Sequence, residues 1–346
     1  AISTIEDQNI KEFFLITFSR VLEYNNMLCS SKGLGTGGIR PAFAHHAFIP
    51  PKMPVEGNLW GINKSSGGFS TIYELRIRKA KEYCLHPFER KVVSSGGKLR
   101  TESIVRVDEE IKGIFAKNFH ELKYSEDKRI MLLCKSSDKI NEIPAGQVDL
   151  IVTDPPYPGN VMYSELANFF YVWLRLLLKD HYEVFKPSLI DRQGEVAGDP
   201  RGNYLIYEKQ MVNIWRICHK VLKPNGNLIF TFHHLKPEAW DALVNSLKEA
   251  NFKITKVYPV YGEMDVAIPI FGKKSTKFDI ILVCEKFIPN EKENIIKLSM
   301  LKPKILKEVE DMTKKLSRYV KLTEYDICLF VLATYSKYRT QYRNLE

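Results

Sequence analysis

The spacing of apolar residues separates an N-terminal part of the chain from the rest. Aromatic and aliphatic side chains recur at helical intervals over residues 5–28 and again over 71–84, so both stretches are expected to be helices. Residues 30–70, between them, are rich in Gly, Pro and Ser and are typical of long loops. The polar stretch that follows holds two strand candidates, at 91–93 and 103–107. We expect residues 1–128 to form an accessory or target-recognition region.

A different pattern begins at Arg129, where short apolar runs alternate with amphipathic stretches. The apolar runs predict strands at 130–134, 148–153, 227–232, 252–260 and 278–285. The amphipathic stretches predict helices at 164–178, 204–222 and 237–250, with a polar loop at 179–203 and a turn at 223–226. This order is typical of an α/β domain with a mostly parallel sheet and helices on both faces. No helix separates the last two strands, so we expect them to pair antiparallel.

These patterns divide the chain into parts with different roles. Residues 129–287 are expected to form an α/β catalytic core. Helical patterns at 291–317 and 324–338 follow it and are rich in Lys and Tyr. They predict a C-terminal helical extension over residues 288–346.

Charge and cysteine usage narrow the class of protein. The formal net charge is +10, and an excess of this sign favours a polyanionic partner such as nucleic acid. No apolar run approaches the ~18 residues that a membrane span needs, and the N-terminus shows no signal-peptide pattern. The six cysteines include no Cys-x-x-Cys pair, which argues against a zinc ribbon. We expect a cytoplasmic protein with reduced core thiols, Cys134 and Cys284 being buried in strands.

The residues with the clearest chemistry are Asp154, Pro155, Pro156 and Tyr157, which follow the strand predicted at 148–153. Ligands of open α/β sheets bind at the carboxyl ends of the strands. An exocyclic amino group on a base is a poor nucleophile, because its lone pair is delocalised into the ring. The Asp154 carboxylate and the Pro155 backbone carbonyl can each accept a hydrogen bond from one N–H of this amino group. The two hydrogen bonds free the nitrogen lone pair. Two successive prolines hold that carbonyl in a fixed direction and have no N–H to compete.

Tyr157 adds an aromatic face of the kind that stacks on flipped bases. The alternative for these four residues is a turn that simply ends the strand, since Asp and Pro are both turn formers. The buried strand before them and the apolar helix after them favour the chemical role. The sequence therefore predicts a pocket for the amino group of a base.

The same segment resembles a known family. Residues 148–157, Val-Asp-Leu-Ile-Val-Thr-Asp-Pro-Pro-Tyr, look like the catalytic motif of the DNA amino-methyltransferases, which modify adenine N6 or cytosine N4. Residues 160–175 are similar to a segment of the large prokaryotic adenine-specific DNA methylases. Shorter likenesses to that group occur in order along residues 13–286, at Phe18-Ser-Arg20, Tyr24-Asn25, Leu28-Cys29, Glu56-Gly-Asn58, Leu222-Lys-Pro-Asn-Gly226, Thr231-Phe-His-His234 and Pro237-Glu-Ala-Trp240.

The resemblance implies a Rossmann-like methyltransferase fold, S-adenosylmethionine as the methyl donor, and an adenine flipped out of double-stranded DNA. It assigns catalysis to Asp154, Pro155, Pro156 and Tyr157. It also places Asp154 against the cofactor and Tyr157 against the substrate base. These roles are expectations that come from the family.

Further residues match family positions around the pocket. Ser136, Ser137 and Asp138 lie in the loop that reaches the cofactor's adenosine in the family. Asn160 and Tyr163 match positions beside the base and are expected to bind the substrate. Glu165 matches a neighbouring position, where capping or packing of the following helix is an equal alternative.

The sequence departs from the family at the cofactor's methionine end. The family has a glycine-rich loop after its first strand, because only Gly lets the backbone approach the cofactor closely there. Residues 32–38, Lys-Gly-Leu-Gly-Thr-Gly-Gly, hold glycines but follow a predicted helix, so an ordinary flexible loop is the favoured interpretation. In the family this loop lies upstream of the matched segment. We therefore expect the first strands and the loop to come from a removed segment or from a second chain.

Other polar residues have weaker assignments. Lys186, Arg192 and Arg201 follow the predicted catalytic helix and are candidate contacts to DNA phosphates, the alternative being a solvated loop. The pairs His45-His46 and His233-His234 suggest metal ligands, but no third ligand is suitably spaced. We favour structural or pocket-lining roles for them and expect no metal site.

The sequence thus favours an S-adenosylmethionine-dependent, site-specific DNA methyltransferase acting on adenine N6. An RNA base methyltransferase is the first alternative, and a recognition subunit that has lost cofactor binding is the second. Adenine and cytosine N4 stay open as targets, as do restriction–modification and phage defence as settings. No membrane partner is expected.

Overall fold

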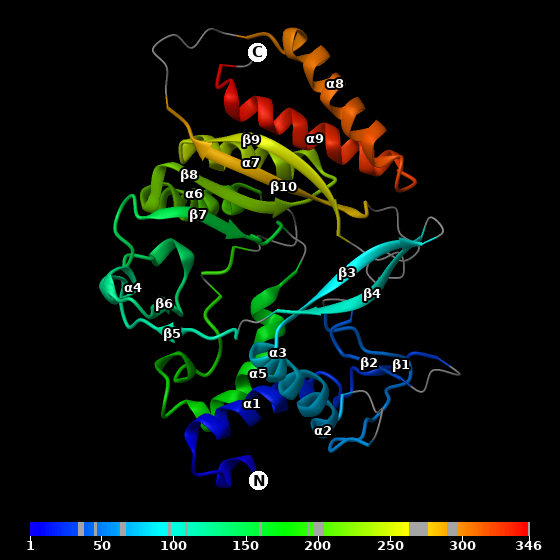
Figure 1. The fold of residues 1–346 in the computed structure, drawn as a ribbon, viewed down its shortest axis with the longest axis vertical. Coiled ribbons are helices and arrows are strands. Elements are labelled where there is room, and N and C mark those ends of the chain that lie inside the picture. Colours follow the sequence, from blue (N-terminus) through cyan, green and yellow to red (C-terminus); the bar gives the residue numbers. More distant parts are fainter. Residues whose placement is uncertain are drawn as a thin grey trace. The chain divides into compact units, whose positions relative to one another are not determined.

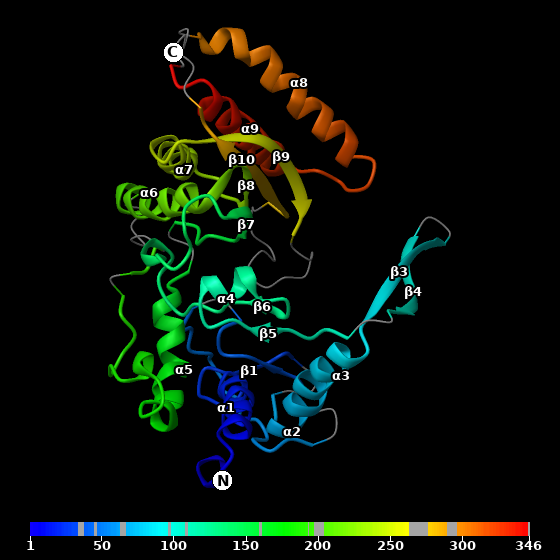
Figure 2. The same ribbon diagram turned by 60° about the vertical axis from the view of Figure 1, so that its left-hand side comes forward.

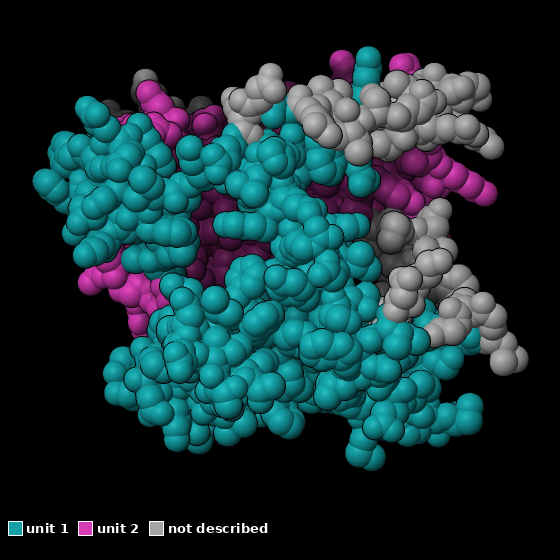
Figure 3. Space-filling model, turned by 60° about the horizontal axis from the view of Figure 1, so that its bottom comes forward, with its two compact units in different colours: residues 1–133, 164–190 teal, residues 134–163, 191–346 magenta. Residues whose placement is uncertain are grey.

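A computed structural model describes residues 1–33, 38–44, 47–62, 67–95, 98–107, 110–158, 161–192, 194–196, 204–262, 276–288 and 296–344. The chain divides into two compact units, which Figure 3 colours separately. Unit 1 comprises residues 1–133 and 164–190, and unit 2 comprises residues 134–163 and 191–346. The units cut across the predicted division, because residues 164–190 of the expected catalytic core belong to unit 1 and the C-terminal helices belong to unit 2.

Unit 1 is built from short elements around the helix α1. Its elements are η1 (Ile2–Thr4), α1 (Gln8–Leu22), β1 (Ser30–Ser31), β2 (Ile39–Arg40), α2 (Phe69–Ile72), the π-helical η2 (Tyr73–Arg78), α3 (Lys79–Leu85), β3 (Phe88–Ser95), β4 (Lys98–Arg106), β5 (Ile114–Phe115), α4 (Phe119–Tyr124), β6 (Lys128–Ile130), α5 (Tyr163–Leu178) and η4 (Glu183–Phe185). The predicted helices at 5–28 and 71–84 are present with shifted ends, and the predicted strands at 91–93 and 103–107 pair as the antiparallel hairpin β3–β4.

Helix α5 belongs to the core of unit 1 from Ser164 onward. Phe43 lies edge-on to Phe169 and Phe170 of α5, with ring centroids 5.2 and 5.6 Å apart. The buried Cys29 joins the same cluster. At the other end of α5, the Tyr171 hydroxyl donates to the carbonyl of Pro187 over 2.8 Å. The apolar face that the sequence predicts for this helix is therefore used for packing within unit 1.

Unit 2 contains the four-stranded sheet. Its elements are η3 (Ser137–Lys139), β7 (Val148–Thr153), α6 (Tyr204–Val221), β8 (Leu222–Phe232), α7 (Pro237–Glu249), β9 (Phe252–Tyr261), β10 (Phe278–Lys286), α8 (Leu298–Leu316) and α9 (Glu324–Gln341). The strand order is β7-β8-β10-β9 (Figure 1). Strands β9 and β10 pair antiparallel, as predicted. Strand β10 runs antiparallel to both of its neighbours, so β7, β8 and β9 run in one direction, in line with the expected mostly parallel sheet.

The helices that touch this sheet pack on one of its faces. Phe230 of β8 lies 5.0 Å from Trp215 of α6 between ring centroids, and Phe232 lies 4.9 Å from Trp240 of α7. Helix α9 reaches the same face, since Phe330 contacts Phe278 at 5.4 Å. The register places Phe232 opposite Ile280 and Phe230 opposite Leu282, so these buried side chains share one face. The expectation of helices on both faces is therefore wrong for the described part of unit 2.

This helix-covered face is the main hydrophobic core of unit 2. Trp215 and Trp240 are among its largest fully buried side chains. Burying a large apolar side chain stabilises a fold by about 1.5–3 kcal/mol, so the aromatic layer between the sheet and α6, α7 and α9 contributes strongly. Helix α8 lies outside α9, which separates it from the sheet (Figure 2).

Two local predictions fail for identifiable reasons. The strand expected at 130–134 is reduced to β6, which pairs with β5 and ends at Ile130, so Leu132 stays 75% exposed and Cys134 is exposed instead of buried. An apolar run forms a strand only where a neighbouring strand can pair with its backbone N–H and C=O groups. None of the described residues pairs in this way with the rest of the run at 130–134. The turn expected at 223–226 lies inside β8, where the ladder with β7 shifts its register between Val148 and Leu150.

The two edges of the sheet differ. On β9, the Thr340 hydroxyl of α9 accepts a hydrogen bond from the Ile254 N–H over 2.8 Å, and the Gln341 amide donates to the Ile254 carbonyl over 2.8 Å. Strand β7, at the other edge, pairs only with β8 among the described residues. Its Leu150 and Val152 are 51% and 70% exposed. One edge is thus covered by a helix, and the other presents an apolar strand to its surroundings.

Candidate active site at the end of strand β7

Asp154 directly follows β7, at the end of the sheet where β8 also ends. The parallel register aligns Val152 with Ile229 and Thr153 with Phe230, so the next positions along the two strands are Asp154 and Thr231. Because side chains alternate across a strand, both project to the face opposite the buried Phe230. The Thr231 hydroxyl donates to Asp154 Oδ1. The ladder between β7 and β8 therefore sets the position of the carboxylate.

Tyr157 approaches the same carboxylate oxygen from another direction. Its hydroxyl lies 3.1 Å from Asp154 Oδ1 and 3.3 Å from the hydroxyl oxygen of Thr231. Its ring lies edge-on to Phe232 and His233, with centroids 5.4 and 5.3 Å apart. The four-residue turn thus folds the tyrosine back over the end of β8, and packing of the ring fixes its hydroxyl beside Asp154.

Burial keeps the tyrosines of this site protonated. Desolvation raises the pKa of Tyr157 well above its usual value, and the nearby carboxylates of Asp279 and Asp154 add to the rise. Burial also raises the pKa of Tyr163, again with a contribution from Asp154. Tyr157 is therefore a neutral hydrogen-bond donor over the whole physiological pH range.

The second oxygen of Asp154 has different surroundings. No hydrogen bond from the described residues reaches Oδ2, and the Asp154 residue is exposed, whereas Pro155 beside it is buried. A carboxylate with one oxygen held by two hydroxyls and the other open can accept a hydrogen bond from an incoming N–H group in a defined direction.

The two histidines after β8 take separate roles. His233 Nδ1 lies 2.8 Å from Asp279 Oδ1 on β10. His234 Nδ1 accepts a hydrogen bond from the Lys236 N–H over 3.0 Å, and burial lowers its pKa, helped by the nearby His233 and Lys236. The ring nitrogens are thus used within the fold, which agrees with a structural role. Within the described ranges, no three or more His, Cys, Asp or Glu side chains gather as a metal site would require.

A cavity of about 390 Å³ lies beside β7, on the face that α6 covers. Its walls are mostly aliphatic, and its polar members include Ser137 of η3 and Asp154. Ser137 and Asp154, both predicted cofactor contacts, therefore border one cavity. Ser136 instead donates its hydroxyl hydrogen bond to Asp138. The lining comprises Ser137, Ile140, Ile143, Val148, Ile151, Thr153, Asp154, Pro155, Pro156, Met211, Ile214, Trp215, Ile217, Cys218 and Val221.

The remaining predicted site residues are dispersed. Lys186 forms an ion pair with Glu183 at 2.5 Å in unit 1, where Glu165 also lies. Arg192 lies in unit 2 and makes further polar interactions. Asn160, Arg201 and the pair His45-His46 lie outside the described residues.

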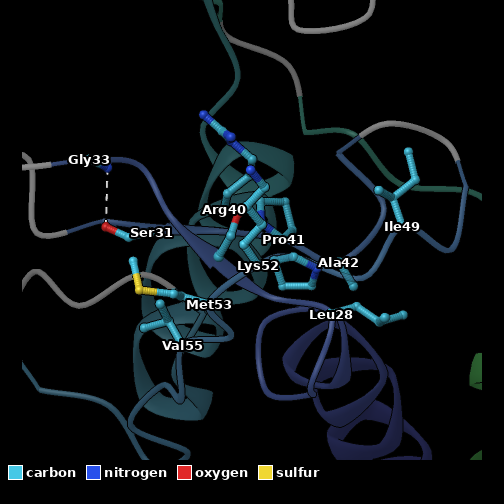
Figure 4. Close-up of a pocket in the computed structure, with 12 residues that line it drawn as sticks. Leu28, Ser31, Gly33, Arg40, Pro41, Ala42, Ile49, Lys52, Met53 and Val55 are labelled. Atoms are coloured by element: carbon cyan, nitrogen blue, oxygen red, sulfur yellow. Dashed lines mark hydrogen bonds between the residues drawn. The ribbon is translucent and has the colours of Figure 1, made fainter.

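The glycine-rich segment at 32–38 lies in unit 1, and its residues 34–37 are outside the described ranges. The Gly33 N–H donates to the Ser31 hydroxyl over 3.1 Å, with Gly33 at a φ of +108°, which favours glycine. Both residues line a second cavity of about 540 Å³, whose polar members include Arg40 and Lys52 (Figure 4). The segment follows the two-residue strand β1 and leads to β2, so it joins a small hairpin.

No protein-family model matches the chain, and no curated protein matches it. One solved structure that matches is a protein of Thermus thermophilus with the provisional name DNA modification methylase. The match has a TM-score of 0.24 and 14% sequence identity, and it covers 48% of this chain and 57% of that structure. Independently, none of the helices in the described part of the chain is long and apolar enough to cross a membrane.

Sequence reasoning missed Thr231 as a functional residue and the pairing of His233 with Asp279. Thr231 was noted only as part of the family-like run Thr231-Phe-His-His234. A signal was present, because a polar residue interrupts the apolar strand at the level where the neighbouring strand ends in Asp154. Using that signal requires the register of β7 against β8, which the sequence alone does not supply.

Proposed function

We propose that the chain carries the catalytic half of an S-adenosylmethionine-dependent methyltransferase that modifies adenine N6 in DNA. The observation that carries the proposal is the hydrogen bonding of Asp154. Both Thr231 and Tyr157 reach Oδ1, while Oδ2 is open to a substrate. An amino group bound to Oδ2 and to the Pro155 carbonyl would have both N–H bonds fixed and its lone pair directed away from the sheet.

The chemistry then requires little from the protein beyond alignment. S-adenosylmethionine, when bound, supplies a methyl group on a positively charged sulfur. The oriented amine would take that methyl group through its lone pair, with the C–S bond breaking as the C–N bond forms, and would afterwards release a proton. Asp154 stabilises the positive charge that develops on nitrogen, which is an electrostatic effect of a preorganised group. A strong base at this position is unnecessary.

The residues present fit the cofactor in part. Ser137 borders the cavity beside Asp154, and aliphatic walls suit the flat face of an adenine ring. None of the described residues that line the cavity is a glycine, so they offer no source for the close backbone approach needed at the methionine end. Ser136, Ser137, Asp138 and Asp154 are the residues proposed to contact the donor, and Ser137 and Asp154 are the two of them that line the cavity.

We propose that additional strands complete this site at the open edge of β7. Leu150 and Val152 are exposed on this strand, and the aliphatic cavity lies against its other face. A strand added beside β7 would satisfy the backbone groups of that edge and bring apolar side chains to both faces. The glycine-rich loop would follow that strand, supplied by a second polypeptide or by a segment outside these residues.

Methyl transfer by the chain, assayed together with the polypeptide that completes the edge of β7, tests the catalytic assignment. Asp154→Ala should lower the rate by about 10² to 10⁴, because orientation and electrostatic stabilisation of the amine are both lost. Asp149→Ala is the matched control, since Asp149 lies at the start of the same strand and pairs with Lys223. Duplex DNA and structured RNA are offered in parallel, and the methylated nucleoside is identified by mass. Asp154→Ala activity within threefold of wild type would refute the catalytic role of Asp154. Detection of N4-methylcytosine or of methylated RNA would show that the substrate is cytosine or RNA instead of adenine in DNA.

Calorimetry tests the completion of the site. The purified chain should bind S-adenosylmethionine weakly or not at all. Micromolar affinity from a purified monomer would show that the methionine-end loop lies within these residues. Gly33–Gly38 would then be the first segment to mutate.

A further inference from the structure

The segment 297–321, which contains helix α8, is the most basic stretch of unit 2. It has eight Lys or Arg residues against three Asp or Glu, which is half of the formal net charge of +10 in a small part of the chain. The apolar residues Leu301, Ile305 and Val309 are buried, at 3%, 5% and 5% exposure. One side of this segment is therefore packed into the fold, and the segment as a whole carries a large excess of positive charge.

The cations gather on the outer side of α8. At 100° per residue, Lys304, Lys307 and Lys315 fall within an arc of about 80°, whose centre lies roughly 140° around the helix from the buried Ile305 and Val309. Arg318 continues the same direction just beyond the end of the helix. All four are exposed, and the spacing gives about 17 Å between Lys304 and Lys315 along the axis. We call Lys304, Lys307, Lys315 and Arg318 the basic face.

Most of this charge is not neutralised within the fold. None of the four residues of the basic face forms an ion pair with another described residue. The neighbouring Lys314 pairs with Glu310 at 2.5 Å. Glu308 points inward, where it bonds to Lys337 and Tyr338 of α9. Asp311 is the acidic residue that shares the outer side.

The far end of the basic face lies at the catalytic end of the sheet. Thr323 and Asp326 cap the N-terminus of α9, and Asp326 also accepts a hydrogen bond over 2.8 Å from the hydroxyl of Thr276, which lies just before β10. The start of β10 pairs with the end of β8, Ile280 lying opposite Phe232. Strand β8 ends beside Asp154. The connection from α8 to α9, which contains Arg318, therefore lies at the same end of the sheet as the candidate active site (Figure 1).

We propose that the basic face of α8 binds the phosphate backbone of duplex DNA and leads the duplex toward the end of the sheet that holds Asp154. A helix with cations spread over about 17 Å is a rigid rod that matches a stiff, regularly charged duplex better than a flexible single strand. Such contacts carry no sequence information and fix position and orientation instead. The choice of DNA as the polyanion rests on the proposed function.

Salt-dependent binding tests this surface. The purified chain is titrated into a labelled duplex of about 30 base pairs at several NaCl concentrations, in the absence of any methyl donor. The test variant carries Lys307→Gln, Lys315→Gln and Arg318→Gln. The control variant carries Arg216→Gln, Lys223→Gln and Lys253→Gln, which removes the same charge from cations that are already in ion pairs. Circular dichroism and thermal unfolding verify that both variants remain folded.

Removing phosphate contacts lowers the slope of log affinity against log salt by about 0.9 per contact. In the test variant, the magnitude of this slope should therefore fall by about two to three, and the affinity near 50 mM salt should fall at least about tenfold. The control variant should keep most of the wild-type slope and affinity. Equal losses in the two variants would show a bulk charge effect and overturn the proposal. An unchanged test variant would show that the face is merely solvated.

The outcome separates this proposal from the proposed function. Asp154→Ala should keep the wild-type slope of log affinity against log salt, because its proposed contact is to a base and not to a phosphate. If the test variant transfers methyl groups and binds DNA like wild type, the proposal for the basic face is refuted and the catalytic assignment still holds. If the basic face binds DNA but no completed complex transfers a methyl group, the catalytic assignment is refuted and the proposal for the basic face still holds. Preferred binding of structured RNA over the duplex would overturn the choice of DNA.

Discussion

Replacing Thr231 with valine isolates the part of the site that the structure adds to the sequence motif. Valine keeps the shape and the β-propensity of threonine, so the strand β8 should be unaffected. The change removes the hydroxyl that donates to Asp154 Oδ1. The carboxylate then keeps one described donor, the Tyr157 hydroxyl at 3.1 Å.

The size of the effect follows from that remaining donor. A hydrogen bond to a charged group is worth about 1.5–3 kcal/mol, and the lower end applies because Asp154 is exposed and Tyr157 still holds it. Thr231→Val should therefore reduce the methyl-transfer rate about tenfold. Removing both hydroxyls, with Thr231→Val and Tyr157→Phe together, should cost about a hundredfold or more. Because orientation matters in the transition state, the loss should appear in kcat more than in KM.

The assay is single-turnover methyl transfer to duplex DNA, using the protein with any polypeptide that completes the edge of β7. Thr255→Val is the matched control, since Thr255 lies in the same sheet and donates to the Val283 carbonyl over 3.2 Å, away from Asp154. If Thr231→Val retains at least half of the wild-type rate, the hydroxyl does not position the carboxylate. If the double variant is no worse than Tyr157→Phe alone, the two hydroxyls do not share one role.

Further predictions concern the stability of unit 2, measured by urea or thermal unfolding. Tyr207→Phe should leave stability unchanged or raise it, because the Tyr207 hydroxyl is buried with no hydrogen-bond partner among the described residues; a loss above about 1 kcal/mol would contradict this. Burial raises the pKa of Tyr207 above its unfolded value of about 10, so the contribution of Tyr207 to stability should be constant below that pH and be lost as pH rises above it, and Tyr207→Phe should reduce the fall in stability above about pH 10. Ser246→Ala should cost about 1–3 kcal/mol, because the buried Trp215 indole N–H loses its acceptor at 3.2 Å, whereas Ser317→Ala at the exposed end of α8 should cost less. Asp326→Ala should cost about 3 kcal/mol, since it removes the side-chain half of the α9 capping box, namely the hydrogen bonds that the carboxylate accepts from Thr276 and Thr323, and wild-type stability would refute that role.

Much of unit 2 could be predicted because local signals and the fold agree there. The strand at 148–153 and the helices near 204–222 and 237–250 have their apolar residues at the period of the element they form. The antiparallel pairing of the last two strands followed from the absence of a helix between them. Local periodicity, however, does not encode strand order, so the position of β10 between β8 and β9 was missed.

The candidate site was predictable to the extent that its residues are contiguous. Asp154 and Tyr157 come from one turn, and their proximity is a property of that turn. Thr231 reaches Asp154 across 77 residues of sequence, so its role depends on strand register. Unit 1 was harder still, because its short strands and its π-helical stretch are stabilised by contacts that no local pattern shows.

The contrast between the two edges of the sheet has a consequence for how the isolated chain would self-associate. Thr340 and Gln341 occupy the outer backbone groups of Ile254 on β9, so growth of the sheet is hindered on that side. Among the described strands, β7 is the one left to recruit another strand, and two copies that meet through β7 about a two-fold axis would bury both open edges at once. Such pairing closes on itself and cannot propagate. The off-pathway product of an uncompleted chain should therefore be a discrete dimer with an eight-stranded continuous sheet, twice the four strands of one copy, and not a fibre.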